Sequence, residues 1–146
     1  MYNLNSNSSA IFAMRRDKKS FIRVTTLESS EMQKRYQRLH SKYLTSADRL
    51  LSEGDLSQAA EKYWGAVATV IKNIAAKRKM RLKTHQDIRD FLRVLDEERP
   101  DLNLWSEFGT AQYLHSNFYE DEIVDWELHK YSESIKALIQ KLSEFV

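Results

Sequence analysis

The sequence predicts an all-α protein, an antiparallel up-and-down bundle of about five helices. Only three Gly and one Pro interrupt its 146 residues, whereas β-sheet proteins need frequent turn residues. Hydrophobic residues make up 42% and charged residues 30% of the chain, which excludes a chain that is disordered throughout. Because a chain of this length can bury one real core, we expect a single helical domain.

The first 26 residues differ in composition from the rest of the chain. They are rich in Asn and Ser, then basic, and they show no sustained apolar period. We therefore predict a flexible basic arm over residues 1–26 and the helical domain over residues 27–146, with Met14 as an alternative start. Such an arm either follows a phosphate backbone or is a solvated terminus, and the sequence leaves both readings open.

The first helix is expected to begin near Ser29 or Ser30, because Ser30 followed by Gln33 forms a capping box. Gly54 ends it. One side carries an apolar stripe at steps of three and four residues: Met32, Tyr36, Leu39, Tyr43, Ala47 and Leu50.

The opposite side of this helix carries a row of cations, which we call the basic ridge: Lys34, Arg38, Lys42 and Arg49. Like charges four residues apart mildly destabilise a helix, so the row invites a reason. The ridge is either a solvated helix face or a binding surface for phosphate groups.

Asp55 is a favourable N-cap for the second helix, whose apolar face is Leu56, Ala60, Tyr63, Val67, Val70, Ile71 and Ile74. Gly65 lies in its middle, where Gly costs about 1 kcal/mol relative to Ala. It therefore predicts a close crossing of two helices.

The second helix runs into a group of cations, which we call the basic cluster: Lys77, Arg78, Lys79, Arg81 and Lys83. Cations near a helix C-terminus complement its dipole, but five within seven residues exceed that need. We expect these side chains to be exposed and free of apolar packing, and the cluster is our candidate anion-binding site.

Three further helices follow. Thr84 caps the third, Pro100 stops it near Glu98 or Arg99, and the fourth begins around Leu102. The last helix repeats apolar residues in alternating steps of four and three: Val124, Leu128, Tyr131, Ile135, Leu138, Leu142 and Phe145. This seam suits packing inside the bundle or against the same helix of a second subunit.

Composition and motifs exclude several functional classes. Without cysteine there are no disulfides and no thiolate chemistry, which fits a cytoplasmic protein, and the apolar runs are far too short for a membrane span. The sequence has no Gly-rich phosphate loop, nucleophile elbow or His-Glu-x-x-His motif. His129 shares a face with Asp125 and Glu122, but we interpret these as solvated groups and expect neither a metal site nor a cofactor.

Charge is distributed unevenly along the chain. Residues 1–93 hold 19 Lys and Arg against 9 Asp and Glu, whereas residues 94–146 hold 4 against 12. The asymmetry either provides a basic face for an anionic partner or lets the two halves of the bundle attract each other.

Three stretches follow one another between Leu50 and Phe145: GDLSQAAEKYWGAVATVIKNIA, RLKTHQDI and YLHSNFYEDEIVD. In this order they resemble the HEPN superfamily, and specifically its archaeal PaREP branch. The resemblance implies a helical bundle, frequent dimerisation, and roles that range from metal-independent RNA cleavage to nucleotide or partner binding in defence and toxin–antitoxin systems.

The resemblance also implies an active site from which this chain departs. RNase members of the superfamily use an Arg followed after four to six residues by a His, near the start of the last long helix. At that place this chain has His115, Asn117 and Tyr119, with no Arg before them. His85 matches a Thr/Ser-His pair at the start of the third helix, to which the resemblance gives a structural role.

Two functional hypotheses follow. The first is a non-catalytic HEPN-like module, a homodimer that binds a nucleotide, RNA or a cognate protein partner. The second is a metal-independent endoribonuclease in which His115 acts as general acid or base. We favour the first because the sequence shows no positioned catalytic partners. In either case the candidate residues form a polar corner, expected to be partly exposed in a groove: His115, Asn117, Tyr119 and Glu120.

Overall fold

The computed structural model describes residues 21–117 and 124–146, and the fold within them is all-α, as predicted. Its five α-helices are α2 (Thr26–Ser52), α3 (Leu56–Lys77), α4 (His85–Glu98), α5 (Leu104–Asn117) and α6 (Asp125–Leu142). Two 3₁₀ turns, η1 (Pro100–Leu102) and η3 (Ser143–Phe145), and two short strands, β1 (Ile22–Arg23) and β2 (Met80–Arg81), complete the described part. None of these helices combines the length and the apolar character that crossing a membrane requires.

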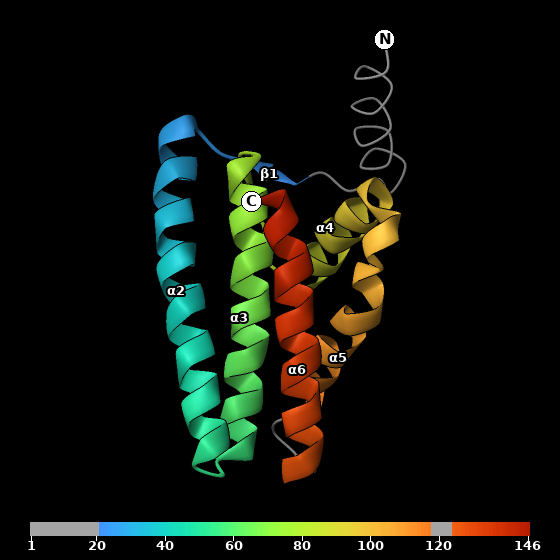
Figure 1. Ribbon diagram of the computed structural model, residues 1–146. Coiled ribbons are helices and arrows are strands. Elements are labelled where there is room, and N and C mark those ends of the chain that lie inside the picture. Colours follow the sequence, from blue (N-terminus) through green and yellow to red (C-terminus); the bar gives the residue numbers. More distant parts are fainter. Residues whose placement is uncertain (1–20, 118–123) are drawn as a thin grey trace.

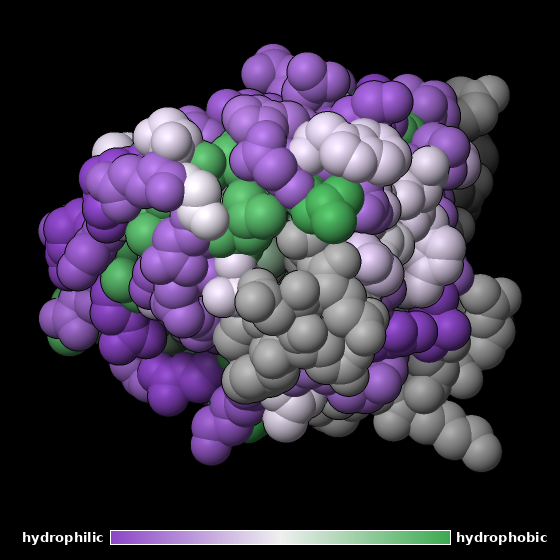
Figure 2. Space-filling model, turned by 90° about the horizontal axis from the view of Figure 1, so that it is seen from below, coloured by the Kyte–Doolittle hydropathy of each residue, from purple (hydrophilic) through white to green (hydrophobic). Residues whose placement is uncertain are grey.

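The three long helices lie side by side, and α4 and α5 cover one side of this layer (Figure 1). Helix α3 is antiparallel to α2, and α6 is antiparallel to α5, as the short connections predict. The neighbours α3 and α6 run parallel, because the two short helices α4 and α5 return the chain between them. Viewed from the end where α2 joins α3, the surface is mainly hydrophilic around a small hydrophobic patch (Figure 2).

The first helix begins earlier than the sequence analysis predicted. Thr25 is the N-cap of α2: its Oγ1 accepts a hydrogen bond from the Glu28 amide at 3.1 Å, and Glu28 accepts one from the Thr25 amide at 3.2 Å. The pair Ser30 and Gln33 is therefore not the cap. Ser29 is buried, and its hydroxyl donates to the Ala76 carbonyl of α3. The sequence contains two overlapping capping patterns, Thr25 with Glu28 and Ser30 with Gln33, and the helix uses the first. Ser29 therefore lies inside α2, where its hydroxyl links α2 to α3.

The packed domain also begins before residue 27, the predicted boundary. Phe21 is buried and contacts the Phe91 ring edge-on, with centroids 5.7 Å apart. Strand β1 pairs with β2, so that Ile22 lies opposite Arg81. Residues 21–26 are thus part of the fold, and the remainder of the predicted arm, residues 1–20, lies outside the described residues.

The boundaries of α4 agree with the prediction, but the start of α5 does not. Thr84 caps α4 in a box with Asp87, and α4 ends at Glu98. The fourth helix begins at Leu104 rather than 102, because Pro100–Leu102 form a 3₁₀ turn and Asn103 has a φ of 51°. That left-handed residue ends the turn before α5 starts.

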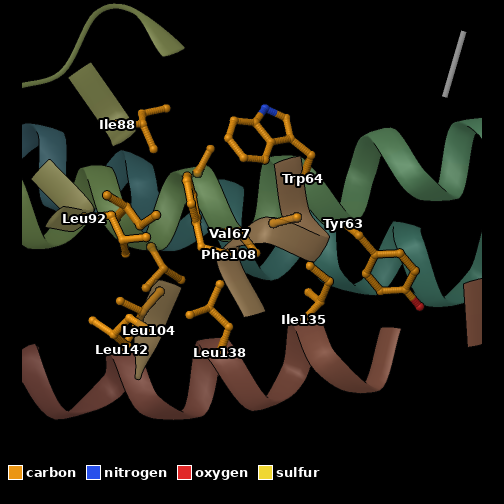
Figure 3. Packing of buried hydrophobic residues seen from close by; sticks show 14 of the residues in the cluster. Tyr63, Trp64, Val67, Ile88, Leu92, Leu104, Phe108, Ile135, Leu138 and Leu142 are labelled. Atoms are coloured by element: carbon orange, nitrogen blue, oxygen red, sulfur yellow. The ribbon is translucent and has the colours of Figure 1, made fainter. Parts of the chain in front are cut away.

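Helix α3 is the centre of the hydrophobic core and has fourteen buried residues. Figure 3 shows part of this core, including Tyr63, Trp64 and Val67 of α3. Four residues of the α6 seam are fully buried in this core: Leu128, Ile135, Leu138 and Leu142. Because the seam is used inside the chain, it no longer argues for a homodimer, which remains a prediction from the family resemblance alone. The predicted close crossing at Gly65 is confirmed, since a Cβ atom there would lie 3.0 Å from Cδ2 of Tyr43 in α2.

Candidate functional site: two histidines on one indole face

Polar and aromatic side chains from three helices meet between the middle of α3, the first turns of α4 and the second half of α5. Each helix contributes two residues three or four positions apart, a spacing that places both on one helix face. We call this group the two-histidine site: Glu61 and Trp64 from α3, His85 and Arg89 from α4, and Gln112 and His115 from α5.

The three rings of the site form a compact triangle. The Trp64 centroid lies 4.8 Å from that of His85 and 4.7 Å from that of His115, and the two imidazole centroids are 5.1 Å apart. The imidazole planes differ by only 12°. In a three-layer column the outer rings would be separated by about twice the spacing of neighbours. The 5.1 Å between the imidazole centroids is also too short for one ring on each face of the Trp64 indole, so both imidazoles pack against the same face and against each other.

A hydrogen-bond relay joins α4 to α5 beside the rings. Gln112 Oε1 accepts from Arg89 Nη1 at 2.5 Å and lies 3.4 Å from His85 Nε2. The Arg89 guanidinium also lies 5.9 Å from the ring centroid of Trp105, which is 40% exposed. One amide oxygen thus positions a cation and an imidazole together.

The environment favours the neutral form of one imidazole. Burial lowers the pKa of His115, the neighbouring His85 lowers that pKa further, and Glu61 opposes the change. His85 Nδ1 is buried without a hydrogen-bond partner among residues 21–117 and 124–146. A proton on His85 would disfavour a proton on His115, which is why the neighbouring ring lowers the pKa of His115.

This arrangement supplies the groups needed for proton transfer at an anionic substrate. A neutral imidazole is a base and a protonated imidazole is an acid, so two neighbouring histidines can serve both halves of a proton-transfer reaction. Arg89 is a permanent cation beside them. Both histidines are only partly buried, so a ligand can reach them.

The predicted polar corner is placed only in part. His115 belongs to the two-histidine site, and Asn117 is the last residue of α5. Tyr119 and Glu120 lie outside the described residues. From the sequence, His85 was given a structural role, and Trp64 and the other members of the site were missed. The available signals were the i, i+4 spacing of His85 with Arg89 and the i, i+3 spacing of Gln112 with His115.

The basic cluster is less free than expected. Arg78 donates to both carboxylate oxygens of Glu98 at 2.6 and 2.8 Å and lies over the Phe91 ring. The Arg81 guanidinium is 3.8 Å from Glu28, and the Lys79 carbonyl accepts from the Val24 amide at 3.0 Å. The expectation that the cluster carries no packing is therefore wrong for Arg78. The exposed side chains of the cluster are those of Lys77, Lys79 and Lys83.

The basic ridge is exposed along α2. Helix α2 forms one edge of the molecule, whereas α4 and α5 lie beyond α3 at the other (Figure 1). The structure therefore does not bring the ridge to the two-histidine site. Arg49 of the ridge pairs with Glu53 at 3.0 Å.

Ion pairs between the two halves of the chain run in both directions. Arg78–Glu98 joins a cation of the first half to an anion of the second. The Lys136–Asp48 pair, at 3.1 Å, instead joins a cation of the second half to an anion of the first. Ion pairing in the described residues therefore favours neither alternative.

Metal-ligating side chains do not gather elsewhere in the described part. Among residues 21–117 and 124–146, no group of three or more His, Asp or Glu side chains is placed to hold a metal ion. His129 lies 3.7 Å from Asp125, both are more than half exposed, and Glu122 lies outside the described residues.

Comparison with known proteins gives one match. The model of the archaeal PaREP1/PaREP8 family matches residues 35–139, a stretch that contains every residue of the two-histidine site. No curated protein and no solved structure matches the chain.

Proposed function

The chain belongs to the archaeal PaREP1/PaREP8 family, and we propose that its two-histidine site cleaves RNA by acid–base catalysis without a metal ion. The observation that carries this proposal is the placement of two partly exposed imidazoles, 5.1 Å apart, on one indole face. The sequence offered no second catalytic group near His115. His85 lies next to it, and Gln112, three residues before His115 on α5, accepts a hydrogen bond from Arg89; these contacts support the proposal.

The chemistry assigns one task to each group. Neutral His115 removes the proton from a ribose 2′-hydroxyl, and the resulting oxygen attacks the adjacent phosphorus. The bond between phosphorus and the 5′-oxygen breaks, and protonated His85 donates a proton to that oxygen. The products are a 2′,3′-cyclic phosphate and a 5′-hydroxyl. Arg89 stabilises the additional negative charge on the phosphate oxygens in the transition state.

RNA is the expected substrate because the mechanism uses the 2′-hydroxyl as its nucleophile, a group that DNA lacks. The HEPN resemblance supports the same chemistry, because RNase members of that superfamily combine an Arg with a His. Here the Arg comes from α4 rather than from the residues before His115 in α5. Gln112 bridges the two helices by accepting a hydrogen bond from Arg89.

The test uses the full chain, a single-stranded oligoribonucleotide and EDTA. We expect cleavage that leaves 2′,3′-cyclic phosphate ends, and no cleavage of the 2′-deoxy oligonucleotide. His85→Ala and His115→Ala should each lower the rate at least about 100-fold. His129→Ala is the matched control, because this exposed imidazole lies on α6 outside the site. An inactive wild-type protein, or cleavage that survives His115→Ala, would refute the proposal.

A non-catalytic RNA-binding module is the second candidate, and the exposed basic ridge favours it. Salt-sensitive RNA binding without cleavage by the wild-type protein would select it. A nucleotide ligand, a cognate protein partner, a role in defence or a toxin–antitoxin system, and a cytoplasmic location remain predictions from the sequence.

A further inference from the structure

A cavity of about 400 Å³ lies between α2, α3 and the end of α6, on the layer of long helices shown in Figure 1. This volume is within the range of small-molecule sites. Its polar lining includes His40, Thr69, Asn73 and Ser143. Its apolar lining includes Tyr36, Val70 and Ile139.

The cavity is separate from the two-histidine site. Asn73 follows Trp64 by nine residues on α3, which corresponds to two and a half turns, so the two side chains leave the helix on opposite faces. They are also about 13 Å apart along the helix axis. None of the six residues of the two-histidine site lines the cavity.

Three polar groups of the lining have already donated their hydrogens. His40 Nδ1 lies 2.9 Å from the Ala66 carbonyl, which can only accept, so the Nδ1 atom donates and the neutral ring has a lone pair on Nε2. The Thr69 hydroxyl donates to the Gly65 carbonyl at 2.8 Å. The Ser143 hydroxyl donates to the Gln140 carbonyl at 2.5 Å. Each group therefore retains acceptor capacity and no free hydrogen.

Asn73 provides the independent observation that this site is incomplete. The residue is only 6% exposed, and its Oδ1 is buried without a donor among the described residues. A buried acceptor without a donor is rare and costs free energy, which a hydrogen bond from a ligand restores. The terminal amide torsion of Asn is broad, so the oxygen can turn towards a donor placed in the cavity.

We propose that this cavity binds a small aromatic compound, not an anion, that carries an amino or carboxamide group. The N–H donors of such a group match the acceptors of His40, Thr69 and Asn73, and its ring packs against the apolar wall. No Lys or Arg side chain is among the described residues of the lining. An anionic ligand would therefore lose hydration without gaining a Lys or Arg partner. The proposal does not rest on RNA cleavage at the two-histidine site.

The test titrates three probes of the same shape into the full chain and follows the methyl NMR signals of Val70 and Ile139. Benzamide should shift both signals, with a dissociation constant on the order of 1 mM, as for a fragment. Methyl benzoate, which has no N–H donor, and benzoate, which is an anion, should bind at least about 10-fold more weakly. Equal binding of benzamide and methyl benzoate would overturn the proposal, and so would unshifted signals.

Variants distinguish a ligand site from a structural asparagine. Asn73→Leu should weaken benzamide binding at least about 10-fold and leave the melting temperature unchanged or higher, because it removes an acceptor without a partner. A lower melting temperature with unchanged binding would overturn the proposal. Thr69→Val should weaken binding as well, and this second variant decides the question if the first does not fold. Thr45→Val, on the exposed side of α2, is the control and should bind normally.

Discussion

The ion pair between Arg78 and Glu98 decides how the basic cluster can be tested, and replacing Arg78 by Ala is the direct perturbation. Two hydrogen bonds of 2.6 and 2.8 Å join the end of α3 to the end of α4. The guanidinium carbon also lies 5.7 Å from the Phe91 ring centroid. Arg78→Ala removes both contacts and leaves the Glu98 carboxylate without this partner.

The expected loss of stability follows from burial. The side chains of Arg78 and Glu98 are 32% and 23% exposed. Breaking a fully buried pair costs about 3–5 kcal/mol, and breaking an exposed one about 0–1 kcal/mol. A partly buried pair lies between these limits, and the cation–π contact adds about 0.5–1 kcal/mol. We therefore expect Arg78→Ala to lower the free energy of unfolding by about 2–3 kcal/mol.

Urea denaturation measures this difference, and Arg49→Ala is the matched control. Arg49 pairs with Glu53 in the same chemistry, but the two side chains are 59% and 53% exposed. The control should therefore lose no more than about 0.5 kcal/mol. Equal losses in the two variants would refute the reasoning from burial. A loss of RNA binding in Arg78→Ala could come from the missing cation or from the lower stability of the fold. Lys77 and Lys83 are therefore the positions at which to test the cluster for anion binding.

Three further predictions follow from the structure. At Gly109 an added Cβ would meet no atom of the described residues within 4 Å. Gly109→Ala should therefore raise the free energy of unfolding by about 0.5–1 kcal/mol in urea titrations. Gly65→Ala should show no such gain, because its Cβ would lie 3.0 Å from the Tyr43 ring. The lowered pKa of His115 means that the unfolded state binds more protons, so stability should fall as the pH drops below about 6.5. His115→Gln should flatten that slope in chemical denaturation at several pH values, by less than about 1.4 kcal/mol per pH unit because the ring is partly exposed. If the basic ridge binds RNA, Arg38→Glu should weaken binding and lower the slope of log affinity against log salt by about 0.7 in filter-binding assays; an unchanged slope would mean that the ridge is only a solvated face.

Local signals explain why much of the fold could be predicted. The apolar period of α6 identified the residues that are buried in the core, and Thr84 and Pro100 set the bounds of α4, because caps and periodicity act within a few residues. The start of α2 was misplaced because two capping patterns overlap, Thr25 with Glu28 and Ser30 with Gln33, and the helix uses the first.

The candidate site could be predicted only in part, since its residues are joined by contacts between helices. His115 was selected from the sequence, whereas His85 was interpreted as structural because the resemblance matched it to a Thr/Ser-His pair at a helix start. The 29 residues between these histidines lie in α4, α5 and the turn that joins them, and the site exists only where both helices pack against Trp64.

Residue order alone therefore decided the fold class, the helix faces that are buried and most helix ends, since each depends on neighbours along the chain. Tertiary packing decided which charged and polar groups are free to act. It places Arg78 against Glu98 and two imidazoles on one indole face, and it leaves Asn73 Oδ1 without a donor beside a cavity. The physical reason is that the protonation, pairing and exposure of a side chain depend on the groups across the interface, which may be far away in the sequence.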